Sequence, residues 1–503
     1  MHVDVIVIGG GPAGSTAARE AAAAGARVVL LDKAAFPRDK PCGGGVNLRA
    51  ARLLPFDLSP VVERTISAVR FSYRQTRPFT RRYPGVLTYM TRRGRLDEFL
   101  VHQAVTAGAD LRERQPVRAI DLNGRVTVRT PSGAISADTL IGADGANGVT
   151  ARLAGLTGPR DLAVALEANV YPDDGPPAAW RDTLALDLGG IPGGYGWLFP
   201  KEDHLNVGVG GWKYLAGGLR PRLDHLARHF GVAPDRLRDL RGHHLPVRRR
   251  GAAIAGGRVM LVGDAAGLVD PLSGEGIYAA IASGRMAARH ALAVIDGRAR
   301  DLAGYQREVD RVLGPELLDS ARLQDLFNLD AAGVRCAMLR RSDRLWHWLC
   351  RIIRGEETYS TLKRRAGPFG PFIDGASWAT HHSACSAAAP DCRPGSRRDR
   401  HSRPSSGRGH ACRLVPRPPR ALRRRAGAAH HPLESIANLR AAGGVRRGGC
   451  LRARAAGRAA APHCRRRLGR VSGSAGRLVL LPRRAAPLAL GERRTRAGGA
   501  CTP

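Results

Sequence analysis

Long apolar runs, methionine and aromatic residues are all scarce in this chain. Only 5% of its 503 residues are aromatic and only five are Met. No stretch reaches the roughly 18–20 apolar residues that a membrane-spanning helix needs, so we expect any membrane contact to be peripheral. The chain enters an apolar β-branched run at Val3 without a basic leader, so we also expect no signal peptide.

Cysteine is sparse over most of the sequence. Only Cys42, Cys336 and Cys350 of the nine cysteines precede residue 376, and they are too few and too scattered for a disulfide framework. This favours a reducing, cytoplasmic setting. The other six lack Cys-x-x-Cys spacing, so we expect no zinc site and no other metal.

Lysine is absent from residues 376–503, and acidic residues are rare there. This stretch has 28 Arg and four acidic residues, and it carries +24 of the formal net charge of +37. Its apolar content cannot offset the chain entropy, so we expect the tail, residues 368–503, to be disordered. An Arg-rich stretch without Lys favours out-of-frame translation of GC-rich DNA over a nucleic-acid-binding arm. Nucleic acid is therefore not an expected partner.

A glycine fingerprint near the N-terminus predicts a dinucleotide-binding unit. The run Val3–Ile8 leads into Gly-x-Gly-x-x-Gly, an Ala-rich helix follows, and a second strand ends at Asp32. Gly9 permits the tight turn, Gly11 lets the backbone approach a pyrophosphate, and Gly14 allows close helix–strand packing. Asp32 is placed to bind ribose hydroxyls. An acid there argues for FAD or NAD and against NADP.

A second glycine-rich segment is typical of fewer protein classes than the first. Residues 262–277 read Val-Gly-Asp-Ala-Ala-Gly-Leu-Val-Asp-Pro-Leu-Ser-Gly-Glu-Gly-Ile. Two such motifs suit one extended cofactor held at both ends. Asp264 would bind the ribityl hydroxyls, and a helix that opens at Gly276 would offer free N–H groups to the pyrimidine edge of a flavin. Together the motifs predict an FAD-dependent oxidoreductase.

The two motifs lie far apart, so we expect a discontinuous FAD-binding domain. We assign residues 1–158 and 251–300 to a Rossmann-like, doubly wound α/β fold. Short strand-like runs in 159–250 predict an inserted antiparallel β substrate domain, to which 71–89 is a candidate addition. Residues 301–367 are expected to form a C-terminal helical segment.

A cluster of histidine and arginine precedes the second glycine-rich segment. His243, His244 and the run Arg248-Arg249-Arg250 are predicted to lie on a solvated face, because adjacent histidines chelate one metal poorly. A prenyl diphosphate or an anionic headgroup is the alternative partner for the arginines.

Three segments together carry a family resemblance. They are Phe-Pro-Arg-Asp-Lys-Pro-Cys-Gly-Gly-Gly at 36–45, Gly-Tyr-Gly-Trp-Leu-Phe-Pro-Lys at 194–201, and the segment at 262–277. With them the chain resembles the geranylgeranyl reductase family, flavoenzymes that saturate the carbon–carbon double bonds of isoprenoids, from residue 1 to about Gly367. The resemblance implies hydride transfer from reduced FAD to an isoprenoid chain. Either NAD(P)H or a ferredoxin-like protein would supply the electrons.

The resemblance also implies site residues. Tyr195 and Trp197 would lie by the flavin and bind substrate; they alternate with Phe199 along one strand, so all three should face one side. An ordinary core stripe is the alternative, and it is more natural for Phe199. Cys42 is a candidate catalytic residue, as proton donor or substrate-positioning group, with simple flavin packing as the alternative. The implied FAD-binding residues, fingerprint included, are Gly9, Gly11, Ala13, Gly14, Asp32, Cys42, Gly43, Gly45, Arg93, Val117, Asp264, Gly276 and Ile277.

A second enzyme function stays open. FAD monooxygenases that hydroxylate an aromatic or quinone precursor share the Gly-Asp and Asp-Gly landmarks of this chain. The Tyr-x-Trp-x-Phe-Pro-Lys block, residues 195–201, favours the reductase.

Overall fold

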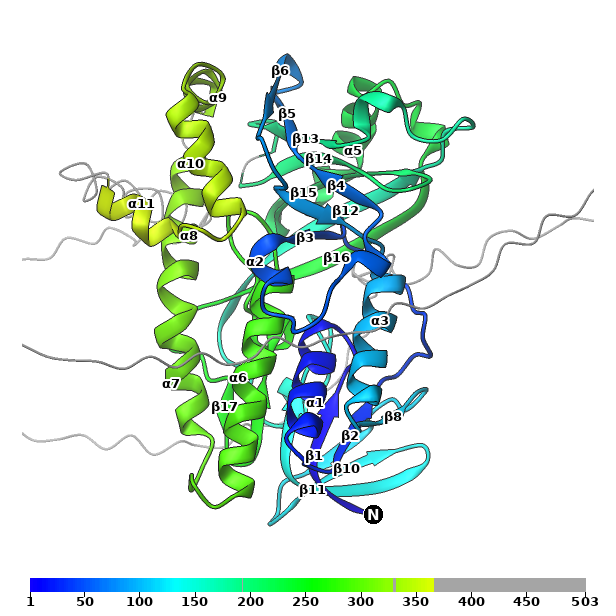
Figure 1. Ribbon diagram of the computed structural model, residues 1–503, viewed down its shortest axis with the longest axis vertical. Coiled ribbons are helices and arrows are strands. Elements are labelled where there is room, and N and C mark those ends of the chain that lie inside the picture. Colours follow the sequence, from blue (N-terminus) through cyan, green and yellow to red (C-terminus); the bar gives the residue numbers. More distant parts are fainter. Residues whose placement is uncertain (192, 329–331, 366–503) are drawn as a thin grey trace, which may run out of the picture. The chain divides into compact units, whose positions relative to one another are not determined.

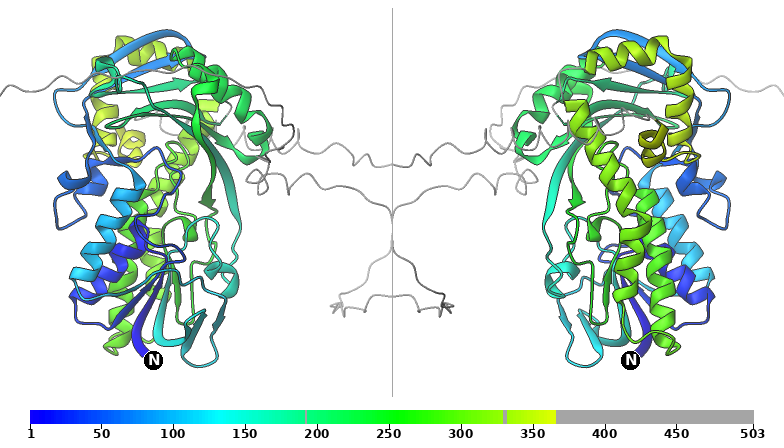
Figure 2. Two further views of the ribbon diagram at one scale, coloured as in Figure 1. Left: turned by 90° about the vertical axis from the view of Figure 1, so that its right-hand side faces the viewer. Right: turned by 90° about the vertical axis from the view of Figure 1, so that its left-hand side faces the viewer.

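The computed structural model describes residues 1–191, 193–328 and 332–365, all of which belong to one compact unit (Figures 1 and 2). The Arg-rich tail, residues 368–503, for which the sequence predicts disorder, lies outside the described residues. Among the helices that the structure describes, none is both long and apolar enough to cross a membrane.

The first glycine motif follows the central strand of a parallel sheet (Figure 1). β1 (His2–Ile8) pairs in parallel with β2 (Val28–Leu31) and with β11 (Gly133–Gly142). β18 leads into the second glycine-rich segment and pairs in parallel with β11. Both motifs therefore follow the carboxyl ends of strands in one sheet. The other strands of this sheet are β8 (Asp110–Arg112), β9 (Ala119–Asp121), β10 (Val126–Thr130), β17 (Ala255–Gly256) and β18 (Val259–Leu261).

Helices cover one face of this sheet, and the β9–β10 hairpin covers the other. Val5 and Val7 pack with side chains of α1 and α6, whereas Ile6 packs with the hairpin, as the alternation of a strand requires. α1 and α6 approach closely at Gly284, where a Cβ would lie 2.4 Å from the Ala13 oxygen. The helices of this region are α1 (Pro12–Ala23), α2 (Leu48–Ala51), α3 (Arg93–Thr106), α4 (Thr150–Leu153) and α6 (Ile277–Ile295).

A second, mostly antiparallel sheet stands beyond the carboxyl ends of the parallel strands (Figure 1). α5 (Leu219–His229) packs on one face of it through Leu223 and Leu226. Its strands, in spatial order, are β16 (Arg238–Arg248), β12 (Arg160–Val170), β15 (Leu205–Trp212), β14 (Tyr195–Pro200), β13 (Thr183–Leu188), β5 (Ala68–Tyr73) and β6 (Thr76–Arg82). A small third sheet contains β3 (Gly45–Asn47), β7 (Thr88–Met90) and β4 (Arg64–Ile66).

The second sheet follows the sequence prediction with two differences. β5 pairs with β13 in parallel and β6 pairs with β5 in antiparallel, so the part taken from the candidate segment 71–89 already begins at residue 68. The edge strand β16 was not predicted, because its Arg and His residues indicated a solvated face. The strands thus confirm the α/β fold class with an antiparallel sheet. The assignment of domains to 1–158 with 251–300, and to 159–250, stays a prediction.

Helices follow the second glycine-rich segment, as predicted for the C-terminal part. Ser342 caps α10 by accepting a hydrogen bond from the Leu345 backbone N–H at 3.2 Å. Trp346 of α10 is buried against Phe71 of β5, and its indole N–H donates to the Arg82 carbonyl at 3.0 Å. These contacts fasten the helices to the second sheet. The helices are α7 (Ala303–Val312), α8 (Gly314–Asn328), α9 (Ala332–Arg341), α10 (Asp343–Ile353) and α11 (Tyr359–Arg365).

Candidate active site

One cavity of about 1200 Å³ lies between the parallel strands' carboxyl ends and the inner face of the second sheet. Most single-ligand pockets measure roughly 300–1,000 Å³, so this cavity has room for a cofactor and a substrate together. The structure brings nearly all predicted site residues to its wall. They are Gly9, Gly11, Ala13, Asp32, Cys42, Gly43, Gly45, Arg93, Val117, Tyr195, Trp197, Asp264, Gly276 and Ile277.

Gly14 does not line the cavity but shapes its edge. A Cβ on Gly14 would lie 1.8 Å from the Gly9 carbonyl oxygen, so α1 packs on the end of β1 only because residue 14 has no side chain. Gly9 itself has φ +103°, a conformation that favours glycine. Gly11 caps α1, and no side chain bonds to the free N–H groups of that cap. The exposed amides and the positive end of the helix dipole suit a pyrophosphate.

Two arginines supply positive charge at the same place. A Cβ on Gly11 would lie 3.5 Å from Arg38 Nη2 and 3.8 Å from Arg93 Nη2. The buried Asp97 orients both: it accepts two hydrogen bonds from Arg93 at 2.8 Å and lies 3.1 Å from Arg38 Nη1. Burial alone would lower the pKa of Arg93, but Asp97 and Cys42 raise it above its ordinary value. Arg38 and Asp97 were not predicted, although Arg93 and Asp97 stand four residues apart on one helix.

Asp32 lies at the carboxyl end of β2, as the fingerprint requires. Its Oδ2 accepts a hydrogen bond from the Gly10 N–H at 2.8 Å, and its Oδ1 accepts one from the Ala34 N–H at 2.9 Å. Arg38 Nε stands 3.3 Å from Oδ2. The carboxylate is thus fixed beside the glycine loop, where an adenosine ribose would meet it.

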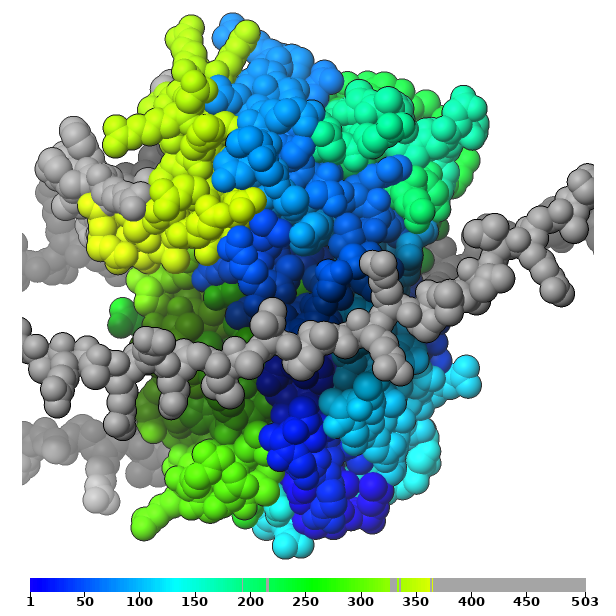
Figure 3. Space-filling view, in the orientation of Figure 1, coloured from blue at the N-terminus to red at the C-terminus, as the bar shows by residue number. Residues whose placement is uncertain are grey.

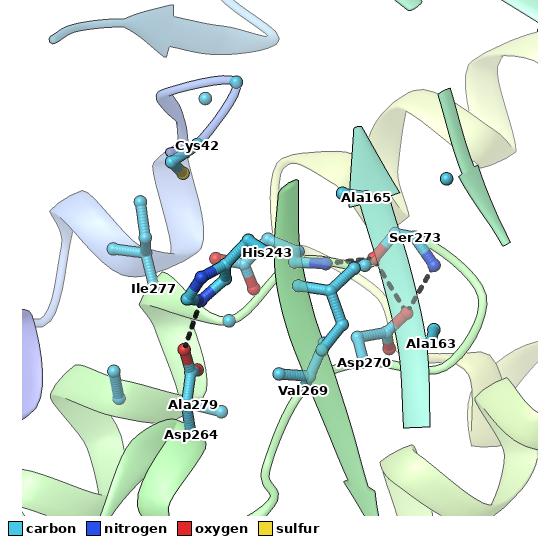
Figure 4. A pocket seen from close by; sticks show the side chains of 18 of the residues that line it. Cys42, Ala163, Ala165, His243, Asp264, Val269, Asp270, Ser273, Ile277 and Ala279 are labelled. Atoms are coloured by element: carbon cyan, nitrogen blue, oxygen red, sulfur yellow. Dashed lines mark hydrogen bonds and ion pairs between the residues drawn. The ribbon is translucent and has the colours of Figure 1, made fainter. Parts of the chain in front are cut away.

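The other motif forms a cluster of charges around Asp264 (Figure 4). Asp264 Oδ2 lies 3.1 Å from Lys40 Nζ and 3.8 Å from His243 Nε2. Burial opposes ionisation of Asp264, yet Lys40 and His243 outweigh it and hold the pKa of this carboxyl well below its usual range. The cluster joins the loop after β2 to β16 and to the second motif.

The prediction of a solvated face is wrong for His243 and Arg248. The His243 side chain is 16% exposed, and Figure 4 shows it reaching into the cavity toward Asp264. Strand alternation explains this, since His243 and Leu245 of β16 line the cavity while His244 between them does not. The Arg248 side chain is 7% exposed and pairs with Asp310 at 2.6 Å.

The second motif ends where α6 begins. Gly276 is the N-cap of α6 and has no side chain with which to cap the helix. Ile277, the first residue of α6, lines the cavity. The neighbouring Glu275 accepts a hydrogen bond from the Tyr278 N–H at 2.8 Å. Burial raises the pKa of Glu275 to about 7.

An aromatic wall, Tyr195, Trp197 and Phe199, lines the cavity from β14. Neighbouring ring centroids stand 5.9 Å and 6.0 Å apart, so all three rings face the same side, as predicted. Tyr195 OH donates to the Ser273 carbonyl, and the Trp197 indole N–H donates to Asn206 Oδ1 at 2.8 Å. Phe199 also lines the cavity, so it is not merely a core residue.

The loop of Cys42 and Gly43 rests against this wall. A Cβ on Gly43 would lie 2.6 Å from the Phe199 ring. Lys201 Nζ donates to the Gly43 carbonyl at 2.6 Å, and Glu167 Oε1 accepts from the Cys42 N–H at 2.7 Å. Burial lowers the pKa of Lys201 to about 8. Sequence reasoning did not predict Glu167 or the role of Lys201, because sheet pairing alone brings them to the loop.

Known proteins are similar to this chain in sequence and in fold. The chain matches the FAD binding domain family over residues 2–188. It is 32% identical over 365 residues to a geranylgeranyl diphosphate reductase of Synechocystis sp., covering 65% of this chain and 86% of the relative. It is 32% identical over 311 residues to a menaquinone reductase of Mycolicibacterium smegmatis, covering 57% and 76%. A crystal structure of a geranylgeranyl bacteriochlorophyll reductase-like protein from Thermoplasma acidophilum gives a TM-score of 0.61 at 24% identity, covering 72% and 99%.

The residues at the cavity fit FAD. The uncapped start of α1 and the two arginines suit the pyrophosphate, and the glycine loop leaves room for its approach. The matches confirm FAD as cofactor, the Rossmann-like α/β fold and the family resemblance. The chain belongs to the geranylgeranyl reductase family of FAD-dependent oxidoreductases.

Proposed function

We propose that the protein reduces carbon–carbon double bonds of an isoprenoid chain. The main observation behind this proposal is that one cavity contains both the proposed FAD-binding residues and a long apolar wall. An isoprenoid offers only dispersion contacts, so it needs such a surface along its length. The names of the relatives, geranylgeranyl diphosphate reductase and menaquinone reductase, support this substrate class. The apolar lining beyond the aromatic wall comprises Val69, Phe71, Leu87, Leu184, Leu186, Leu188, Ile191, Leu339, Leu349, Ile352 and Ile353.

The chain's own residues would bind and orient the reactants. FAD supplies the hydride when it is bound and reduced. We propose that Asp32 binds the adenosine ribose, that Asp264 binds the ribityl hydroxyls, and that Tyr195 and Trp197 hold the isoprenoid against the flavin. Cys42 lies at the wall and is proposed to position the substrate. The remaining proposed FAD contacts are Gly9, Gly11, Ala13, Gly14, Gly43, Gly45, Arg93, Val117, Gly276 and Ile277.

An anaerobic assay tests the function. The purified full chain, with FAD reduced by dithionite, is incubated with geranylgeranyl diphosphate and with menaquinone, without oxygen. After re-oxidation in air, which returns any menaquinol to the quinone, we expect products heavier by two mass units for each double bond reduced, identified by mass spectrometry, and none without protein. Replacing dithionite by NADPH, NADH or reduced ferredoxin then identifies the donor. A hydroxylated product that forms only with oxygen and NAD(P)H would instead support the monooxygenase alternative.

We also propose that the protein meets the cytoplasmic face of a membrane through α9 and α10. Leu339, Leu349 and Ile352 of these helices line the apolar end of the cavity. The outer side of the same helices is basic and carries Met338, which is 54% exposed. Figure 3 shows the two helices in yellow-green, projecting beside the hairpin of β5 and β6. Anionic headgroups complement such a surface. Its exposed arginines include Arg340, Arg341 and Arg344.

Charge reversal at this surface is expected to release the protein from anionic vesicles. Each arginine near such a membrane contributes about 1 kcal/mol, so changing Arg340, Arg341 and Arg344 to Glu should weaken binding by about 100-fold or more. Co-sedimentation with phosphatidylglycerol vesicles measures this. The matched control reverses three exposed arginines around the β9–β10 hairpin, at the far end of the parallel sheet, and should bind like the wild type. Equal loss in both variants would contradict the proposed surface. The control residues are Arg118, Arg125 and Arg129.

A further inference from the structure

Glu167 is a buried acid in the cavity wall that the function above does not use. It lies on β12, an otherwise apolar strand at this point, and is 8% exposed. Its Oε1 accepts a hydrogen bond from the Cys42 N–H at 2.7 Å. Because that bond uses one carboxyl oxygen as an acceptor, the other oxygen can carry a proton without breaking it.

Sheet register places Glu167 in one row with the aromatic wall. Glu167 pairs with Gly208 of β15, and Gly208 pairs with Trp197 of β14. A Cβ on Gly208 would lie 2.0 Å from the Trp197 ring, so the indole lies across the glycine that separates it from Glu167. Both side chains line the same cavity. The Glu167 carboxyl therefore borders the space in which an isoprenoid held by Trp197 would lie.

The surroundings of Glu167 keep its proton available near neutral pH. Burial, with a smaller contribution from Asp39, raises the pKa of Glu167 to about 7, although the Cys42 N–H, Lys201 and Asn206 favour the charged form. Its other strand neighbour, across from it on β16, is Arg241, which pairs with Asp39. A carboxyl with such a pKa is matched to general acid chemistry at neutral pH.

Other acids near the wall are poorer proton sources. The Tyr195 hydroxyl already donates to the Ser273 carbonyl, and burial raises its pKa well above the ordinary value. Glu275 shares a pKa of about 7, but its carboxyl is held at the start of α6 by the Tyr278 N–H. Negative charge is favoured there by the helix dipole.

We propose that Glu167 is the acid that protonates the substrate during double-bond reduction. Saturating one double bond adds a hydride to one carbon and a proton to the other, while the flavin is oxidised and the alkene is reduced. Glu167 gives its proton to the carbon that does not take the hydride, and the resulting carboxylate recovers a proton from water. The inference rests on the proposed function, with dithionite as the source of electrons in the assay.

The change Glu167→Gln tests this directly, because glutamine keeps an oxygen to accept the Cys42 N–H but has no acidic proton. General acid catalysis typically contributes about 10²–10⁴-fold, so we expect the anaerobic rate at pH 7 to fall at least about 100-fold. Binding of FAD, measured by fluorescence titration, should not change. The wild-type rate should fall as the pH rises above about 7, when Glu167 loses its proton, and the variant should lack this step. Wild-type speed, or an unchanged pH profile, in Glu167→Gln would overturn the proposal.

Infrared spectroscopy of the holoenzyme gives a readout that needs no substrate. A protonated-carboxyl band that titrates near pH 7 is expected in the wild type and should be weakened in Glu167→Gln, leaving the share of Glu275. Asp187→Asn is the matched control. Asp187 is buried on the same sheet and its pKa is likewise raised by burial, but it does not line the cavity. The control should keep the pH profile of turnover. If the band is unchanged in Glu167→Gln, Glu167 does not hold the proton, whether or not the protein reduces an alkene. If the band weakens but no tested alkene is reduced, only the proposed function is contradicted.

Discussion

Purified Gly14→Ala protein is expected to be colourless. The added Cβ would lie 1.8 Å from the Gly9 carbonyl oxygen and 2.9 Å from the Ala143 Cβ, so α1 must move away from the end of β1. Overpacking of this kind costs about 1–3 kcal/mol and more where backbone atoms block relaxation. The displaced loop would no longer present its amides to the pyrophosphate. We therefore expect FAD affinity to fall by about 100-fold or more, measured by flavin fluorescence, together with a lower melting temperature.

Gly314→Ala is the matched control for this change. Gly314 begins α8, as Gly14 lies in the first turn of α1, but among the described residues no atom beyond its chain neighbours and its own helix backbone lies within 4 Å of its Cβ position. Alanine forms helix better than glycine by about 1 kcal/mol, so this variant should stay yellow and be at least as stable as the wild type. If Gly14→Ala also stayed yellow, the glycine loop would not hold the cofactor in the way proposed.

The fold was predictable because its signals are local. β1 is a short β-branched run that ends at a glycine turn. In β14, the alternation of Tyr195, Trp197 and Phe199 with other residues indicates which side chains share a face of the strand. β16 was not predicted because its many Arg and His residues are typical of a segment exposed to solvent. Only one side of that strand faces the cavity, so the number of charged residues along the strand does not show which of its side chains are buried. Its position at the edge of the sheet comes from pairing with β12, about 75 residues earlier in the chain.

The site was predictable where one motif holds several of its residues. Asp32 and Asp264 each belong to a glycine-rich segment whose spacing indicates a cofactor contact. Glu167 and His243 belong to no such motif, and the side chain of each reaches the cavity through sheet register. The one local signal for Glu167 is an acid inside the apolar stretch 162–168 of β12, where burial makes its charge costly unless it is hydrogen-bonded. Such residues become visible only when the strands are paired.

Loss of the Asp264 carboxylate is the second change expected to have a large effect. Asp264→Ala leaves Lys40 and His243 facing each other without the anion that both approach. Removing one partner of a buried charge pair costs about 3–5 kcal/mol, and a hydrogen bond to a charged group on the ligand side contributes a further 1.5–3 kcal/mol or so. We expect the protein to lose FAD on gel filtration and to melt at a lower temperature. Asp224→Ala, which breaks the exposed pair with Arg220 on α5, should do neither.

The pH dependence of unfolding separates the charge of Asp264 from its shape. Lys40 and His243 hold the pKa of Asp264 below its ordinary value of 3.8, so the folded protein binds this proton more weakly than the unfolded chain does. The resulting stability is fully present above pH 3.8 and is lost as the pH falls toward the lowered pKa. Asp264→Asn keeps the size and one acceptor oxygen but cannot ionise. It should therefore unfold more easily than the wild type at pH 6, with the difference shrinking below pH 4. An equal difference at both pH values would show that Asp264 acts through packing and not through its charge.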